Sequence, residues 1–147
     1  MPDLTVDAEG LALAWVKAYP GLVGVGMPLI GMHLTDDARS PGKGVIGSLA
    51  VTGLREVDME GLGDSARLSF KVEGIGGESS GKRQTERAAR ALANAVRTLT
   101  GVPVVVSTPD GETARISHAH TVYGPTWLGA PAGRPTYRVD ATFVFQV

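Results

Sequence analysis

The sequence predicts an α+β fold: a mixed or antiparallel sheet of about four to six strands with one long helix packed on it. Two stretches carry this prediction. Residues 66–73 alternate apolar and polar side chains with the period of two that a half-buried strand has. Residues 83–99 repeat alanine, leucine and valine at three- and four-residue steps, the period of an amphipathic helix. A chain of this length predicts one domain, over residues 1–147.

A second helix is expected near the N-terminus, from Asp7 to Tyr19. Asp3 or Asp7 is expected to cap its start, and Pro20 to end it. A short strand is expected at residues 22–27. The helix has one apolar stripe at helical spacing, made of Leu4, Ala8, Leu11, Ala12, Trp15, Val16 and Tyr19.

Residues 28–64 are rich in glycine and are expected to form an extended loop or a hairpin arm. Within them, residues 45–52 have the pattern of a strand, which 54–59 could continue. Two interpretations stay open: a winding connection between two strands of the sheet, or an arm that contacts a partner. Structureless connections longer than about 12–15 residues are uncommon unless they are functional or disordered. This favours the arm.

The rest of the chain is expected to complete the sheet. The long helix should end at Gly101, because glycine suits the left-handed position after a helix. Strands are expected at 102–107, 113–123 and 136–147, and residues 124–135 are expected to form a loop. One face of the middle strand is expected to hold Ala114, Ile116, His118, His120 and Val122.

The composition excludes several classes of protein. With 14 basic and 15 acidic residues, the chain has no overall charge that would attract nucleic acid or a membrane surface. It has no cysteine, which excludes disulfides and thiolate metal sites and suits a reducing compartment. No apolar run approaches the ~20 residues of a membrane span, and no signal peptide is recognised. We therefore expect a soluble intracellular domain.

One segment comes close to a nucleotide-binding motif. Residues 76–83 satisfy the G-x-x-x-x-G-K spacing of a phosphate-binding loop and lie between an expected strand and helix. The motif next needs Ser or Thr for magnesium, and Arg83 stands there instead. Glycine-rich loops produce such matches by chance, so a plain connection is the favoured interpretation.

No other residues form a recognisable catalytic site. His118 and His120 could hold a metal if His33, Asp36 or Asp37 came close, but histidines on a half-exposed strand more often pack or form hydrogen bonds. The chain has no cysteine nucleophile and no G-x-S-x-G turn. We expect no catalytic residue, no metal and no cofactor, and hence no enzyme.

Exposed basic and aromatic side chains are candidates for contacts. Arg83, Arg87, Arg90 and Arg97 share one helix without interleaved aromatics, which favours a solvated face over a nucleic-acid site. Copies assembled in a ring would still present a basic belt. Trp127 is either an interface anchor or a side chain folded back over the end of the sheet, and the two interpretations have equal weight.

Two local sequences, together with the order of the elements, carry a resemblance. They are Thr-Glu-Arg-Ala-Ala-Arg-Ala-Leu at 85–92 and Gly-Arg-Pro-Thr-Tyr-Arg-Val-Asp-Ala-Thr at 133–142. In these features nearly the whole chain resembles the tail terminator (tail completion) proteins of long-tailed bacteriophages, including those of actinobacterial phages. The family has no catalytic motif, so no functional residue is carried over.

The resemblance implies a structural role in a virion. Such a protein forms a ring, usually of six copies, on the head-proximal end of the tail tube, stops tube polymerisation and offers a surface for joining the head. The implied partners are further copies of itself, the major tail tube protein and the head–tail connector or stopper protein. DNA passes through the lumen without sequence-specific binding, and no membrane is involved.

The implied location is the tail of the virion, after assembly in the host cytoplasm. A head–tail neck or connector protein is the alternative, followed by a small-ligand-binding or enzymatic module. Sheet edges and long hairpins are natural assembly surfaces. The residues expected at the interface are Leu29, Ile30, Met32, Val45, Ile46 and Trp127.

Overall fold

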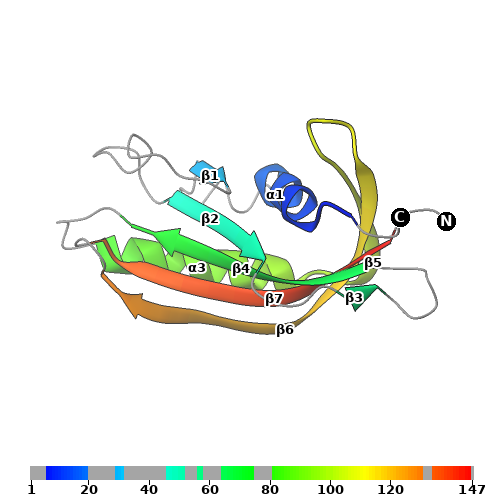
Figure 1. Ribbon diagram of the computed structural model, residues 1–147. Coiled ribbons are helices and arrows are strands. Elements are labelled where there is room, and N and C mark those ends of the chain that lie inside the picture. Colours follow the sequence, from blue (N-terminus) through cyan, green and yellow to red (C-terminus); the bar gives the residue numbers. More distant parts are fainter. Residues whose placement is uncertain are drawn as a thin grey trace.

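The computed structural model describes residues 6–19, 29–31, 46–51, 56–57, 64–74, 81–130 and 134–146. The segments predicted at 22–27 and 76–80 lie outside these ranges. The described elements confirm the predicted α+β fold (Figure 1). They are α1 (Ala8–Ala18), β1 (Leu29–Gly31), β2 (Ile46–Val51), β3 (Glu56–Val57), β4 (Asp64–Glu73), α3 (Gly81–Arg97), β5 (Thr100–Ser107), β6 (Thr113–Gly129) and β7 (Thr136–Gln146).

The described strands form one seven-stranded sheet in the order β1-β2-β4-β7-β6-β5, with β3 paired to β4. The β1–β2 pair is parallel and the other pairs are antiparallel, so the sheet is mixed, as predicted. Five of the described strands are long, which agrees with the expected four to six: β2, β4, β5, β6 and β7. The short strands β1 and β3 bring the described total to seven. The sheet curls, and α3 lies along it (Figure 1).

One face of the sheet is apolar and carries both helices. α1 reaches this face through Trp15, whose ring centroid lies 6.1 Å from that of Phe143 on β7. Alternate positions on the opposite face are polar and exposed, for example Arg67 and Lys71 on β4. The buried side chains from the two central strands and α3 include Leu68, Phe70, Val72, Ala88, Ala89, Leu92, Ala93, Val96, Val139, Ala141, Phe143 and Phe145.

α1 confirms the predicted N-terminal helix. Asp7 caps it, because its carboxylate accepts a hydrogen bond from the backbone N–H of Gly10 at 3.1 Å. A Cβ at position 10 would lie 2.2 Å from Asp7 Oδ2, so glycine leaves room for the cap. Val6 donates its N–H to the buried carboxylate of Asp64 at 2.9 Å, which ties the start of α1 to β4.

α3 ends earlier than the sequence indicates. The backbone N–H and the hydroxyl of Thr98 both donate to the carbonyl of Ala95, at 3.0 and 2.6 Å. These bonds to the third residue back tighten the last turn and end the helix at Arg97. The prediction that Gly101 stops the helix is wrong, because β5 already begins at Thr100 and includes Gly101.

β6 is longer than predicted. Residues 124–129, expected to form part of a loop, continue the strand and pair with β7, and Trp127 lies opposite Tyr137. Shifts in the pairing take up the additional residues. Gly124 has a φ of 106°, and a Cβ there would lie 2.5 Å from the carbonyl oxygen of Arg138. The glycine that suggested a loop is required by the close approach of two strands.

An irregularity in the first half of β6 changes the side to which its residues point. Between Ile116 and His118 the pairing with β7 shifts by one residue. Ala119 therefore packs against the core, while His118 and His120 fall on the outer face of the sheet. The prediction that the histidines share a face with Ala114 and Ile116 is wrong, because a bulge reverses the alternation at this point.

The glycine-rich segment 28–64 contributes strands to the sheet. It contains β1, β2 and β3, and β2 pairs with β4 from Ile46, opposite Glu73, to Val51, opposite Leu68. The other residues of the segment lie outside the described ranges, so the partner-contacting arm stays a prediction.

Candidate functional site

Large apolar side chains of the described residues are exposed on β5 and β6. Val102 and Val105 are 78% and 62% exposed on β5, at the edge of the sheet. Trp127 and Leu128 are 43% and 39% exposed at the end of β6, and Tyr123 is also exposed on this strand. Contiguous exposed apolar surface marks contact sites, whereas single exposed apolar residues are ordinary.

Trp127 is packed on one side and open on the other. Its ring centroid lies 5.1 Å from that of Tyr137 on β7, and the Nζ atom of Lys82 lies 4.4 Å from it. The indole therefore rests on the end of the sheet and still offers surface to a partner. We call the exposed group Lys82, Arg83, Trp127 and Leu128 the basic–aromatic corner.

Tyr137 is the buried support of this corner. Burial, as the largest effect, raises the pKa of its phenol above the usual 10.0; the charge of Glu86 raises it further, and Arg90 lowers it. The hydroxyl therefore stays protonated at neutral pH, and the indole rests on an uncharged ring.

The exposed face of α3 is basic. The first turn contains no acidic residue and carries Lys82 and Arg83, which oppose the helix dipole. Arg90 pairs with Glu86, the acidic residue of this helix. Within the described part of the chain, Arg83 and Arg87 have no carboxylate partner. Positive charges in the first turn stabilise a helix less than acidic residues would. They are available for contact with a partner that carries negative charge.

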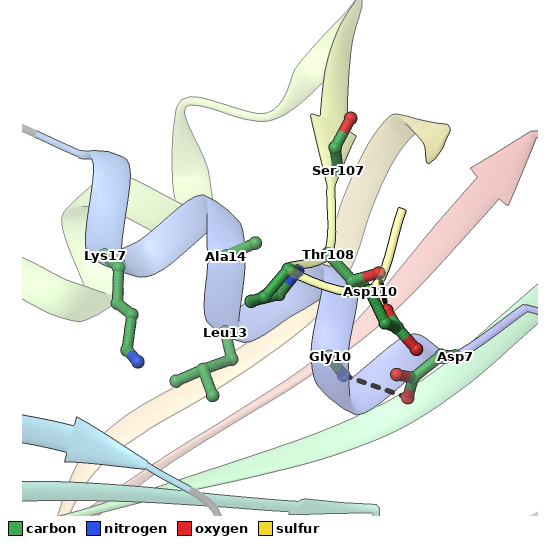
Figure 2. Close-up of a pocket in the computed structure, with 9 residues that line it drawn as sticks. Asp7, Gly10, Leu13, Ala14, Lys17, Ser107, Thr108 and Asp110 are labelled. Carbon is green, nitrogen blue, oxygen red and sulfur yellow. Dashed lines mark hydrogen bonds between the residues drawn. The ribbon is translucent and has the colours of Figure 1, made fainter. Parts of the chain in front are cut away.

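A groove lies between α1 and the turn that joins β5 to β6 (Figure 2). Its volume is about 530 Å³, and Leu13 and Ala14 of α1 line it together with Pro109 of the turn. Asp7 and Asp110 also line it, and both are exposed. We call this the acidic groove; its remaining lining residues are Gly10, Lys17, Ser107 and Thr108.

Hydrogen bonds hold the wall of the acidic groove in place. The hydroxyl of Thr108 bonds to the carboxylate of Asp110 and accepts the backbone N–H of Glu112 at 3.0 Å. The carboxylate of Glu112 accepts the backbone N–H of Asp7 at 3.0 Å, which joins the turn to α1. Glu9 and Glu112 add to the negative charge around this end, against the one positive charge of Lys17 in the lining.

Sequence reasoning misses the acidic groove because its walls are far apart in the chain. Asp7 and Glu112, which join them, are 105 positions apart. The available signal is the acidic character of both segments, and the sequence does not show that they meet.

The six residues predicted at an interface lie in different places. Trp127 belongs to the basic–aromatic corner. Leu29, Ile30 and Ile46 are in β1 and β2, where Leu29 lies opposite Ile46. Met32 and Val45 lie outside the described residues.

The two histidines lie close together on the outer face. Their ring centroids are 5.7 Å apart; the Nδ1 atom of His118 contacts the hydroxyl of Ser117, and that of His120 contacts the hydroxyl of Thr121. The described ranges contain no cluster of three or more side chains able to hold a metal ion, and the other suggested ligands lie outside them. No helix in those ranges is long and apolar enough to cross a membrane.

Comparison with known proteins gives a likeness of fold. No family model and no curated protein matches the chain. Among solved structures it is similar to a chain from the virion of a native gene transfer agent particle, with 18% identity and a TM-score of 0.58 over 99% of this chain and 98% of that chain. A second solved chain is 17% identical over 95% of this chain and 89% of that one, and its TM-score of 0.45 is too low to support an argument. The protein thus shares its fold, over its whole length, with a chain of a virion particle.

Proposed function

We propose that the protein is a structural component of a phage-like virion and that it acts as a tail terminator. In this proposal several copies, six in the usual arrangement, form a ring on the head-proximal end of the tail tube. The ring stops the addition of tube subunits and gives the head connector a surface to join. DNA passes through its lumen without sequence-specific contacts.

The observation that carries the proposal is the full-length likeness to a chain of the gene transfer agent virion. The likeness is one of fold, and the role comes from the resemblance of the sequence to tail terminators. The surface of the molecule agrees with assembly, because exposed apolar and charged groups gather at the basic–aromatic corner and the acidic groove.

A terminator needs one face that fits the end of the tube and a second face that does not repeat the first. The six apolar residues Leu29, Ile30, Met32, Val45, Ile46 and Trp127 remain the proposed contacts within the ring or with the tube. Trp127 has the clearest support, since it is partly exposed and rests on a buried ring.

The test is assembly in solution. Light scattering after gel filtration should give the mass of a closed ring for the purified protein, and electron microscopy should show rings. Added to polymerising major tail tube protein, the rings should shorten the tubes and decorate one end. A protein that binds the head connector and leaves tube length unchanged would instead be a neck component, and a monomer without effect on tube length would contradict the proposal.

A further inference from the structure

We propose that neighbouring copies in the ring join end to end, with the basic–aromatic corner of one copy seated in the acidic groove of the next. This inference rests on the proposed function and names both sides of the contact and the chemistry that joins them.

The two surfaces lie at opposite ends of the 17-residue strand β6. In Figure 1 the end of β6 and the start of α3 are at the left, whereas the turn between β5 and β6 is at the top, with α1 beside it. A cyclic assembly uses a head-to-tail contact between two different surfaces, and it closes when the rotation per subunit divides the circle. Surfaces at opposite ends suit such a contact.

Both surfaces have an apolar part. The acidic groove offers Leu13, Ala14 and Pro109, and its volume of about 530 Å³ lies within the roughly 300–1,000 Å³ range of sites that enclose drug-sized molecules. Trp127 and Leu128 present exposed apolar surface at the other end. Tryptophan is among the residues that most often dominate the affinity of an interface.

The charges of the two surfaces are opposite. Asp7 and Asp110 lie in the lining of the groove, whereas Lys82 lies over the ring of Trp127 and the exposed Arg83 follows Lys82 in the chain. Complementary charges across an interface fix its orientation, speed association and make it sensitive to salt. The two positive charges in the first turn of α3 oppose the helix dipole, and a contact with carboxylates would offset that cost.

A reciprocal charge exchange tests the pairing. Lys82→Glu replaces one of the two positive charges of the corner by a negative one and should weaken its attraction to the acidic groove. Asp110→Lys replaces one of the two carboxylates of the groove lining by a positive charge and should weaken its attraction to the corner. Each variant alone should lose rings, with self-association roughly tenfold or more weaker. Mixed in equal amounts, the two variants present opposite charges at both contacts and should form rings of alternating subunits.

Controls separate this contact from general effects. Arg67→Glu reverses one positive charge on the outer face of β4 and should keep the ring mass of the wild type. Trp127→Ala should weaken self-association roughly 30-fold, as expected for a hot-spot residue, whereas Val102→Ala, at a more exposed apolar position on β5, should not. Circular dichroism and thermal unfolding show whether each variant is folded.

The outcomes distinguish the inference from the proposed function. Restored rings in the mixture of folded variants would support the pairing. If Lys82→Glu and Trp127→Ala each still form rings of the wild-type mass, the pairing is overturned and the terminator proposal stays intact. A wild type that shortens tail tubes without forming a ring of its own would also overturn the pairing. Variants that lose rings alone and do not regain them when mixed would exclude this pair of surfaces.

Discussion

β4 and the outer half of β6, residues 123–129, both pair with β7, yet the two pairings differ. β4 pairs with β7 over ten residues without a shift, and its inward side chains are buried. The outer half of β6 pairs with the same strand through several shifts and leaves Tyr123, Trp127 and Leu128 exposed. The regular pairing of β4 with β7 thus places side chains in the core. The shifted pairing of β6 with β7 leaves β6 free to present side chains to a partner.

The largest expected effect tests this division of roles. Phe143 contacts Trp15, Phe70 and Phe145 in the core. Phe143→Ala should lower the free energy of unfolding by about 3–5 kcal/mol, because it leaves a cavity among these rings. Trp127→Ala should lower it by less than about 1 kcal/mol, as expected for a half-exposed side chain. Urea denaturation of both variants measures the difference, and equal losses would contradict the comparison.

The next effect concerns the shifted pairing itself. Gly124→Ala should destabilise the fold by more than about 2 kcal/mol, since it combines a positive φ with a Cβ placed 2.5 Å from the carbonyl of Arg138. The matched controls are Gly111→Ala and Gly129→Ala, which have φ values of 99° and 93° and nothing within 4 Å of the added Cβ. Their losses should be smaller in thermal unfolding. If all three lose the same stability, the close approach at Gly124 has no energetic consequence.

A smaller effect is expected at the acidic groove. Asp7→Ala removes the carboxylate that caps α1 and should lower the free energy of unfolding by about 1 kcal/mol. Asp7→Asn keeps a side-chain acceptor and should recover most of this loss while it removes the charge. Denaturation and ring mass, measured on both variants, separate the cap from the charge.

The smallest effect appears at alkaline pH. The raised pKa of Tyr137 means that the unfolded chain loses the phenol proton at lower pH than the folded chain does. Its contribution to stability is therefore complete below about pH 10, the unfolded value, and is lost as the pH rises through the folded pKa. Tyr137→Phe should reduce the fall in unfolding free energy above pH 10, as measured by urea denaturation at a series of pH values.

The regular parts of the fold were predictable from periodicity. β4 and β7 alternate with period two, and α1 and α3 show helical spacing, because each buries one face against the same core. The same method failed in β6, where a bulge reverses the alternation and where Gly124 and Pro125 suggested a loop. Bulges interrupt the periodic signal, and glycine serves both loops and close strand approaches.

The candidate site was predictable only in part. Trp127 was visible as an isolated aromatic between glycine and proline residues, and the basic face of α3 was visible in its arginines. The acidic groove was not, since it forms from α1 and a turn that are far apart in the chain and meet in the folded structure. Local sequence carries no information on such a meeting of distant segments.

The bulge in the first half of β6 has a consequence for the comparison of this chain with its relatives. One residue fewer near Ser117 would remove the bulge, since Ile116 and His118 already lie opposite the consecutive residues Phe145 and Val144 of β7. His118 and His120 would stay on the outer face, and Ala119 would stay toward the core. Relatives that differ by a single deletion at this point would therefore keep both the architecture and the chemical surface of the sheet, whereas a bulge lost without a deletion would exchange the two faces. An alignment across this position should therefore match residues by their pairing partners on β7 and should not rely on an ungapped match of the sequences.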